Sequence, residues 1–241
     1  MLRKTLLIII CSSVFWSCEK EQPIAFSETI ISPETTAIIE VVYPKFQELS
    51  SRDRNINAKL SSEISKSMQF SDTLNAKLSI EDAIILFDKD YLAFKNKYPD
   101  SQMQWSTTVD SEVIYQSPNI VCVGVNTYMN TGGAHGNSYI KLLNFNTETG
   151  DLLDKTAIIS DTLALSKIAK QYFLKETEAE IIEGKIENYF WDKEFQLPEE
   201  IGFNDEGLLL LYNTYEIASY AQGIIEFTIP FEEINTLLKA Y

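Results

Sequence analysis

The sequence predicts an α+β protein in which helices pack on a mainly antiparallel sheet, with two closely associated subdomains. Three observations support this class. Strand-like segments follow one another between residues 104 and 146 with only short turns between them, and short turns join antiparallel strands. Amphipathic helices are grouped before and after these strands instead of alternating with them. The sequence contains no internal repeat and no low-complexity segment.

The N-terminal elements are a strand and two helices. Residues 35–43 are rich in β-branched side chains and predict a strand that Pro44 should end. Apolar residues at helical spacing predict a helix over 47–70: Leu49, Ile56, Leu60, Ile64 and Met68. A second helix begins after Ser79, which with Asp82 resembles a capping box. Its buried face is predicted to hold Ile84, Phe87, Tyr91, Phe94 and Tyr98.

Three consecutive strands are predicted over residues 104–117, 119–130 and 138–146. In the middle strand, valines alternate with smaller or polar residues, so its two faces differ. Cys122 lies among these residues, and we interpret it as a small buried side chain. A turn then leads to a short strand around Leu152.

The C-terminal elements begin with a helix over 162–180, for which Asp161 is the N-cap. Residues 184–206 are predicted to be irregular and anchored by Trp191 and Phe195. Two strands and a final helix complete the prediction, at 208–215, 224–229 and from Pro230 onward.

The N-terminus has the layout of a secretory signal, with Arg3 and Lys4 before an apolar stretch too short to span a membrane as a helix, which needs ~20 residues. Ser17-Cys18 resembles a bacterial lipoprotein cleavage site of the looser Bacteroidota type. The sequence therefore predicts a signal peptide over 1–17 and a lipidated Cys18 with a tether over 18–29. The expected product is an outer-membrane lipoprotein of the cell envelope that faces the periplasm or the exterior.

The chain is strongly acidic. Removal of the signal would leave 18 Lys and Arg against 35 Asp and Glu, so the net charge would change from −15 to about −17. Such a surface repels nucleic acid and favours basic partners, although acidity also simply keeps an exported protein soluble. Cys11 leaves with the signal and Cys18 takes the lipid, so the mature chain is expected to have no internal disulfide.

The single histidine, His135, lies in a glycine-rich tract between two predicted strands. The glycines permit backbone conformations that other residues rarely adopt. One interpretation is a tight connection in which His135 bonds to nearby backbone. The other is a loop that contacts a partner, through Asn130, Gly132, Gly133, His135 and Asn137.

Two tracts resemble a family of exported bacterial domains. The first runs from Tyr128 to Asn137 and continues into Asn144-Phe145-Asn146 and Thr149-Gly150. The second has the pattern Tyr-x-x-Tyr-Glu-Ile-Ala-x-Tyr-Ala-x-Gly over 212–223. The chain resembles the paired domains of unknown function numbered 4163 and 3298 (DUF4163 and DUF3298). The resemblance implies a DUF4163-like α+β subdomain over 30–155 and a DUF3298-like α+β subdomain over 156–241.

The resemblance implies recognition more than catalysis. One class in the family is the lysozyme-binding extracellular part of an anti-sigma factor (RsiV-like), and another lies beside a peptidoglycan deacetylase module (PdaC-type). The chain shows no transmembrane helix for the first role, and one histidine cannot supply the metal ligands of the second. Signal relay and metal-dependent deacetylation are therefore not expected.

No catalytic constellation stands out. A zinc site needs three or four suitable ligands, and a His/Cys-rich set cannot be assembled. No nucleophile elbow and no phosphate-binding loop is present. Acidic pairs such as Glu199-Glu200 are interpreted as solvated surface and not as a glycosidase pair. We expect no catalytic residues, no metal and no cofactor.

The second family tract offers a second candidate patch, formed by Tyr212, Tyr215, Glu216 and Tyr220. Alternatively, its tyrosines pack a corner while Glu216 accepts backbone hydrogen bonds. The expected function is a non-catalytic binding module that recognises lysozyme-like basic proteins or peptidoglycan fragments. Alternatives are a carboxylate-dependent enzyme acting on envelope polysaccharide and a structural envelope lipoprotein.

Two triplets, Asp72-Thr73-Leu74 and Asp161-Thr162-Leu163, resemble the O-glycan acceptor motif of Bacteroidota exported proteins. The second also suits a helix start, so the motif alone does not decide whether either threonine is modified.

Overall fold

The computed structural model describes residues 23–69 and 77–239. The predicted signal peptide, Cys18 and the triplet at 72–74 lie outside these residues. Within the described part of the chain, no helix combines the length and apolarity needed to cross a membrane.

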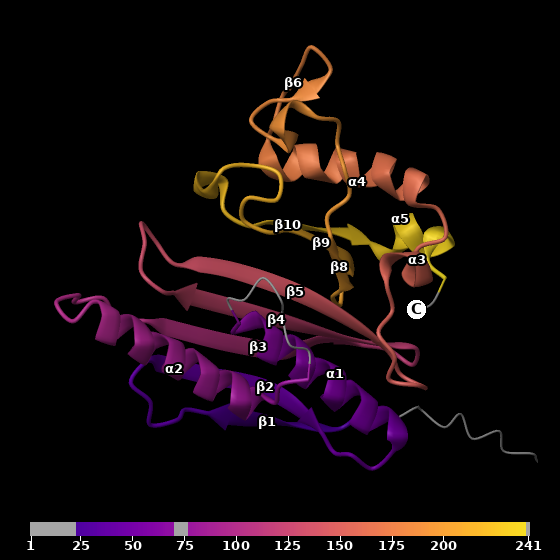
Figure 1. The fold of residues 1–241 in the computed structure, drawn as a ribbon. Helices are drawn as coiled ribbons and strands as arrows, with labels where there is room; N and C mark the ends of the chain where they lie inside the picture. Colours follow the sequence, from indigo (N-terminus) through magenta and orange to yellow (C-terminus); the bar gives the residue numbers. More distant parts are fainter. Residues whose placement is uncertain (1–22, 70–76, 240–241) are drawn as a thin grey trace, which may run out of the picture.

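The centre of the fold is a five-stranded sheet with the order β1-β2-β3-β4-β5 (Figure 1). Neighbouring strands are antiparallel except β2 and β3, which are parallel because two helices cross over between them. The predicted α+β class with a mainly antiparallel sheet is confirmed. The strands are β1 (Phe26–Ile31), β2 (Ile38–Phe46), β3 (Ser106–Gln116), β4 (Ile120–Asn130) and β5 (Asn137–Asn146).

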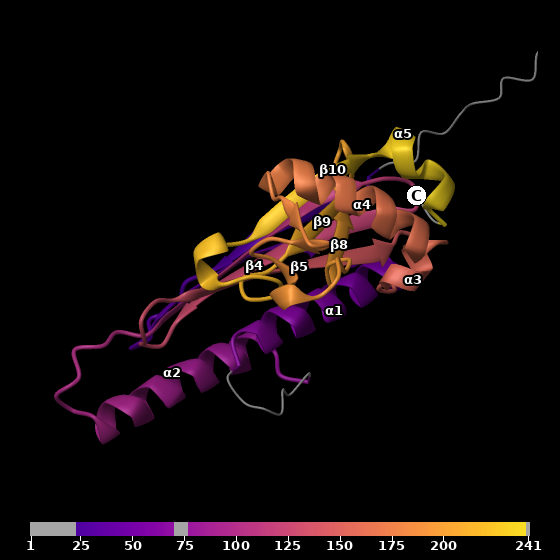
Figure 2. The same cartoon turned by 90° about the horizontal axis from the view of Figure 1, so that it is seen from above.

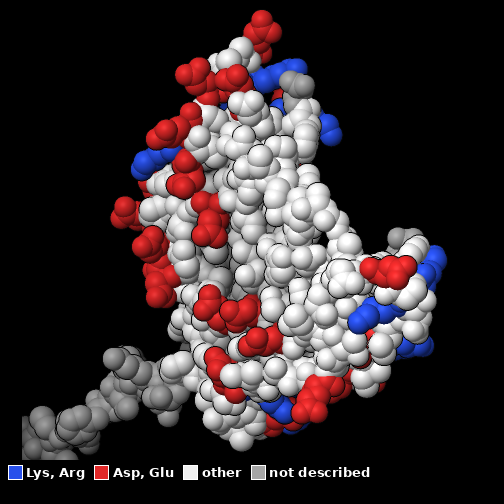
Figure 3. Space-filling model, turned by 90° about the vertical axis from the view of Figure 1, so that its left-hand side faces the viewer, with Lys and Arg blue, Asp and Glu red and all other residues white. Residues whose placement is uncertain are grey.

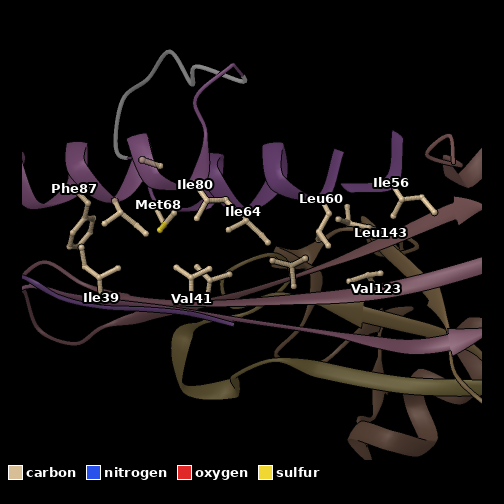
Figure 4. Close-up of a cluster of buried hydrophobic side chains, with 14 of the residues drawn as sticks. Ile39, Val41, Ile56, Leu60, Ile64, Met68, Ile80, Phe87, Val123 and Leu143 are labelled. Carbon is tan, nitrogen blue, oxygen red and sulfur yellow. The ribbon is translucent and has the colours of Figure 1, made fainter. Parts of the chain in front are cut away.

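Helices α1 (Ser51–Ser67) and α2 (Ile80–Lys97) run along one face of this sheet (Figure 2). Ser50 and Asp53 form a capping box at α1, and Ser79 caps α2 by accepting the Asp82 N–H. Figure 4 shows the apolar side chains of the two helices pointing at the strands. This first core includes Ile56, Leu60, Ile64, Ile84, Phe87 and Tyr91 from the helices, with Ile39, Val41, Val123 and Leu143 from the sheet.

The C-terminal elements lie beside β5, on the face of the large sheet opposite α1 and α2 (Figure 1). The helices are α3 (Lys155–Ile158), α4 (Thr162–Thr177) and α5 (Phe231–Ile234), with 3-10 turns η1 (Phe190–Asp192), η2 (Tyr220–Gln222) and η3 (Asn235–Leu237). The strands are β6 (Ile181–Ile182), β7 (Lys185–Ile186), β8 (Glu200–Phe203), β9 (Gly207–Tyr212) and β10 (Ile225–Pro230). They form a hairpin and a three-stranded sheet of order β10-β9-β8.

A second core joins these elements to the large sheet. Ile120 and Cys122 point from β4 into it and meet α4 and the small sheet. Cys122 is fully buried, as predicted, and burial raises the pKa of its thiol to about 12. Because Gly202 carries no side chain, β8 approaches closely: a Cβ there would lie 2.8 Å from the Cys122 Sγ.

Side chains, and not a sixth strand, close the outer edge of β5. Asn213 accepts a hydrogen bond from the Ile140 N–H and donates one to the Ile140 carbonyl, both at 2.8 Å. The Glu200 carboxylate accepts the Leu142 N–H at 2.8 Å. Asn213 and Glu200 are 5% and 6% exposed. This junction fixes the C-terminal elements against the large sheet.

Several predicted boundaries differ from the structure. Strand β1 begins at Phe26, inside the segment predicted as tether. Strand β2 continues through Pro44 to Phe46, because β2 pairs with β3 only as far as Val42 and Pro44 therefore needs no N–H on that side. Leu49 precedes α1 and is exposed.

The segment predicted as irregular also contains more structure than expected. It includes β8, whose four residues are all buried. Phe195 packs against the second core as predicted. The prediction that Trp191 anchors this segment is wrong, because its side chain is 55% exposed. Helix α4 is capped by Asp161 as predicted and ends at Thr177.

Candidate functional site

The structure brings the two predicted patches together. The β4–β5 connection carries His135, and the β9–β10 connection carries Tyr215 and Tyr220. The His135 ring stacks on the Tyr220 ring with centroids 3.6 Å apart and planes inclined by 23°. The Tyr220 hydroxyl donates to the Gly136 carbonyl at 3.2 Å, and the Tyr215 hydroxyl lies 3.5 Å from the His135 Nε2. Two loops about 80 residues apart in sequence thus form one surface.

The contacts of His135 indicate which ring nitrogen carries the proton when the imidazole is neutral. Its Nδ1 lies 2.8 Å from the Gly136 carbonyl oxygen, which can only accept. Nδ1 therefore carries the proton, and Nε2 is left as an acceptor that faces the Tyr215 hydroxyl. His135 makes the backbone contact proposed in the first interpretation and is also exposed at the surface.

Two glycines in the loop are required by close packing. Gly132 has a φ of +86°, and a Cβ there would overlap the side chain of Met103. A Cβ on Gly136 would overlap the ring of Tyr128. Gly133 has open space around it and a φ of +157°. Because Gly132 and Gly136 have no Cβ, the loop packs closely against Met103, which precedes β3, and against Tyr128 in β4. Asn130 stabilises the same turn by accepting the Gly132 N–H at 3.1 Å.

The second patch divides into buried and exposed parts. Tyr212 does not belong to the surface: it is 1% exposed in the second core, and its hydroxyl donates to the Gln196 carbonyl at 2.6 Å. Glu216 accepts the N–H groups of Asn213 at 2.8 Å and Glu199 at 3.0 Å, so its carboxylate fixes the corner. Tyr215 is 53% exposed.

The surface formed by these loops is aromatic and almost uncharged. We call it the aromatic surface; it consists of Tyr128, His135, Tyr215 and Tyr220, with Trp191 beside it. Apart from Glu216, neither 130–137 nor 213–223 contains a charged residue. The Trp191 Nε1–H donates to the Glu216 carbonyl at 3.4 Å, which joins Trp191 to the corner. Figure 3 shows this end of the molecule, with an uncharged centre and acidic side chains along one margin.

Acidic side chains also surround a groove between the two sheets. Asp110, Glu112 and Glu226 line it, over a floor that includes Leu142 and Leu211. The groove has a volume of about 200 Å³. Among the ion pairs of the described residues, none involves these three carboxylates. Their charge is therefore available to a partner.

Glu200 is the site residue that the sequence did not reveal. It was interpreted as solvated, but it is buried and accepts hydrogen bonds from the Tyr139 hydroxyl at 3.0 Å and the Leu142 N–H. Burial is the largest influence on its pKa, which is raised above the ordinary value although both hydrogen bonds act in the opposite direction. Burial and, after it, the nearby Glu200 carboxylate raise the pKa of Tyr139.

The described residues contain no group of three or more His, Cys, Asp or Glu side chains placed to hold a metal ion. The site offers exposed aromatic rings and hydrogen-bonding groups from two loops.

Comparison with known proteins locates two family models on this chain. Residues 151–232 match DUF3298, a protein family of unknown function. Residues 31–138 match the model named deacetylase PdaC. No curated protein matches the chain.

Two solved structures share the fold. The chain is similar to a DUF3298 family member from Bacteroides fragilis, with 18% identity and a TM-score of 0.66 over 89% of this chain and 93% of that one. It is also similar to a DUF3298 family protein from Pseudomonas aeruginosa, with 17% identity and a TM-score of 0.55 over 90% and 93%. At these identities the likeness shows a common fold and not a common activity.

The raised pKa of Glu200 predicts a pH-dependent contribution to stability. The folded state binds this proton more tightly than the unfolded state, so the contribution is complete below the ordinary glutamate pKa and is lost as the pH rises through the raised one. Urea unfolding should be measured between about pH 4 and pH 7. The free energy of unfolding of wild type should exceed that of Glu200→Gln by the largest amount at the acid end of this range.

The matched control is Glu199→Gln, which removes the neighbouring exposed carboxylate. Its difference from wild type should change less with pH than that of Glu200→Gln, because this side chain is not buried on folding. A difference for Glu200→Gln that stays constant across this range would contradict the assignment.

Proposed function

We propose that this chain is a non-catalytic binding module of the cell envelope, DUF4163- and RsiV-like in architecture, that recognises a basic protein of the lysozyme type. The observations that carry the proposal are the aromatic surface, assembled from two distant loops, and the acidic groove lined by Asp110, Glu112 and Glu226. Tyrosine and tryptophan dominate the energetically important centres of protein interfaces, while charged groups lie at the rim.

The aromatic surface is organised before any partner binds. His135 is held by its stack on Tyr220 and by the Gly136 carbonyl, and Tyr220 is held by its own hydrogen bond to Gly136. The corner beneath Tyr215 is fixed by the two hydrogen bonds to Glu216. Little side-chain freedom remains to be lost on binding, which favours affinity.

The charge of the acidic groove favours a basic partner. Asp110, Glu112 and Glu226 take part in no ion pair among the described residues, and the whole chain carries a net charge of −15. An acidic rim accelerates association with a basic protein and makes it sensitive to salt.

The state of the carboxyl groups supports binding over hydrolysis. Burial raises the pKa of Glu200, which is a property of general acids. Its two oxygens are occupied by Tyr139 and Leu142, and it is buried. A glycosidase needs two carboxyl groups that both reach the substrate.

We further propose that Cys18 is lipidated and holds the domain at the outer membrane. If so, residues 19–23 bridge at most about 17 Å. Ile24 donates its N–H to Gln116 at the end of β3, whereas the aromatic surface lies beyond the opposite end of the paired strand β4. Eleven strand residues extend about 35 Å, so the aromatic surface faces away from the anchored end.

Binding to a basic lysozyme tests the proposed function. Tyr215→Ala should weaken binding on the order of tenfold or more, because it removes a ring of the aromatic surface that is 53% exposed. Combined Asp110→Asn, Glu112→Gln and Glu226→Gln should mainly lower the association rate and flatten its salt dependence. Biosensor kinetics at several salt concentrations measure both effects.

Matched controls separate these effects from general ones. Glu176→Gln, Glu178→Gln and Glu180→Gln remove the same charge from exposed positions elsewhere, and Leu163→Ala removes an exposed apolar side chain at the start of α4. Both should leave binding unchanged. Absence of lysozyme binding, or equal losses in control and test variants, would refute the proposal.

Lipidation is tested by fractionation of cells that produce the full chain. Wild type should be found in the outer-membrane fraction with a diacylated N-terminal peptide by mass spectrometry, because the lipid supplies the membrane affinity. Cys18→Ala should leave that fraction. Unmodified Cys18 in the wild-type protein would contradict this part of the proposal.

A further inference from the structure

A pocket lies where the sheet extends beyond the helix that covers it. Helix α1 ends at Ser67, whereas the β4–β5 hairpin continues. The ion pair between Glu63 and Lys141, at 3.4 Å, marks the last part of β5 that α1 covers. The next residues on this face line a pocket of about 360 Å³, a volume within the range of small-ligand sites.

The floor of the pocket consists of two cross-strand pairs. Thr127 is opposite Tyr139, and Met129 is opposite Asn137, so all four side chains share one face of the hairpin. Ser67, Thr131 and His135 contribute to the walls. Tyr128 points to the opposite face of the hairpin, on the side of the aromatic surface. The pocket is therefore a distinct site, and His135 is the one residue of the aromatic surface among its described lining residues.

The lining excludes several ligand classes. The described residues of the lining include no Lys, Arg, Asp or Glu, so they offer no counter-charge for a phosphate, a carboxylate or a cation. The lining is also not purely apolar. No side-chain hydrogen bond is present for Thr127, Thr131 or Asn137 among the described residues, and these groups are free to bind a ligand.

Two rings beside these polar groups are held in place. The Tyr139 ring is 39% exposed, and its hydroxyl is fixed by the buried Glu200 carboxylate. His135 is fixed by Tyr220. A fixed ring presents a π-face on which an apolar C–H surface can stack, while the hydroxyl and amide groups remain for hydrogen bonding.

We propose that this pocket binds one ring of a neutral saccharide. A sugar ring combines an apolar C–H face with several uncharged hydroxyl groups, which matches a fixed tyrosine ring beside two threonines and an asparagine. The pocket is half-open and small, so binding in the millimolar range is expected for a single ring. The inference does not depend on recognition of a basic protein.

An NMR titration of the expected mature chain, residues 18–241 with Cys18→Ser, tests the proposal. The probes are a trisaccharide of N-acetylglucosamine, maltotriose and, as an anionic counterpart, trigalacturonic acid. At least one neutral probe should shift the backbone amide signals of Thr127, Met129, Asn137 and Tyr139. The anionic probe should leave them unchanged.

Matched variants locate the binding site. Thr127→Val and Asn137→Ala should each weaken binding of the neutral probe on the order of tenfold, because each removes one hydrogen-bonding group. Thr108→Val and Asn126→Ala remove the same groups on the opposite face of the sheet and should have no effect. Thr127→Val is isosteric and breaks no recorded protein hydrogen bond, so a loss of binding would not reflect misfolding.

The proposal is overturned if neither neutral probe shifts these signals at low-millimolar concentration. It is also overturned if shifts occur but the pocket variants bind as wild type does. Tyr215→Ala lies outside the pocket, so it should keep saccharide binding while losing lysozyme binding. The failure of one proposal is therefore distinguishable from the failure of the other.

Discussion

The rest of the structure depends on how the outer edge of β5 is closed. A strand edge presents N–H and C=O groups, and a buried group without a partner costs about 1–3 kcal/mol. Here Asn213 pairs with both backbone groups of Ile140, and Glu200 pairs with the N–H of Leu142. These two side chains belong to the C-terminal elements. The same contacts therefore satisfy the edge and fix the position of the loop that follows β9.

The site follows from this position and from the length of the β4–β5 hairpin. Because Asn213 is fixed against Ile140, the loop that begins there brings Tyr215 and Tyr220 to His135. The β4–β5 hairpin extends beyond the end of α1. The pocket therefore lies on one face of the hairpin and the aromatic surface on the other. Glu200 connects the pocket to the edge of β5, since its carboxylate accepts hydrogen bonds from both the Tyr139 hydroxyl and the Leu142 N–H.

Local signals in the sequence predicted the elements that have them. The caps at Ser79 and Asp161 and the stripe through Phe87 and Tyr91 were correct, because capping and periodicity act within a few residues. Contacts between segments that are distant in sequence have no such local signal. Glu200 resembles any other glutamate in an acidic chain, and the burial of Tyr212 depends on Phe173 and Phe190, which lie far from it in sequence. The two candidate patches were each identified, but their contact was not.

Hydrogen exchange at the β5 edge tests the central claim most directly. The account predicts that the amides of Ile140 and Leu142 exchange about as slowly as central β4 amides such as Val123, and that Asn213→Ala accelerates exchange at Ile140 more than at Val123. Exchange of both amides at the rate of an unpaired strand edge in the wild-type protein would contradict it, because the two parts of the chain would then not be joined through β5.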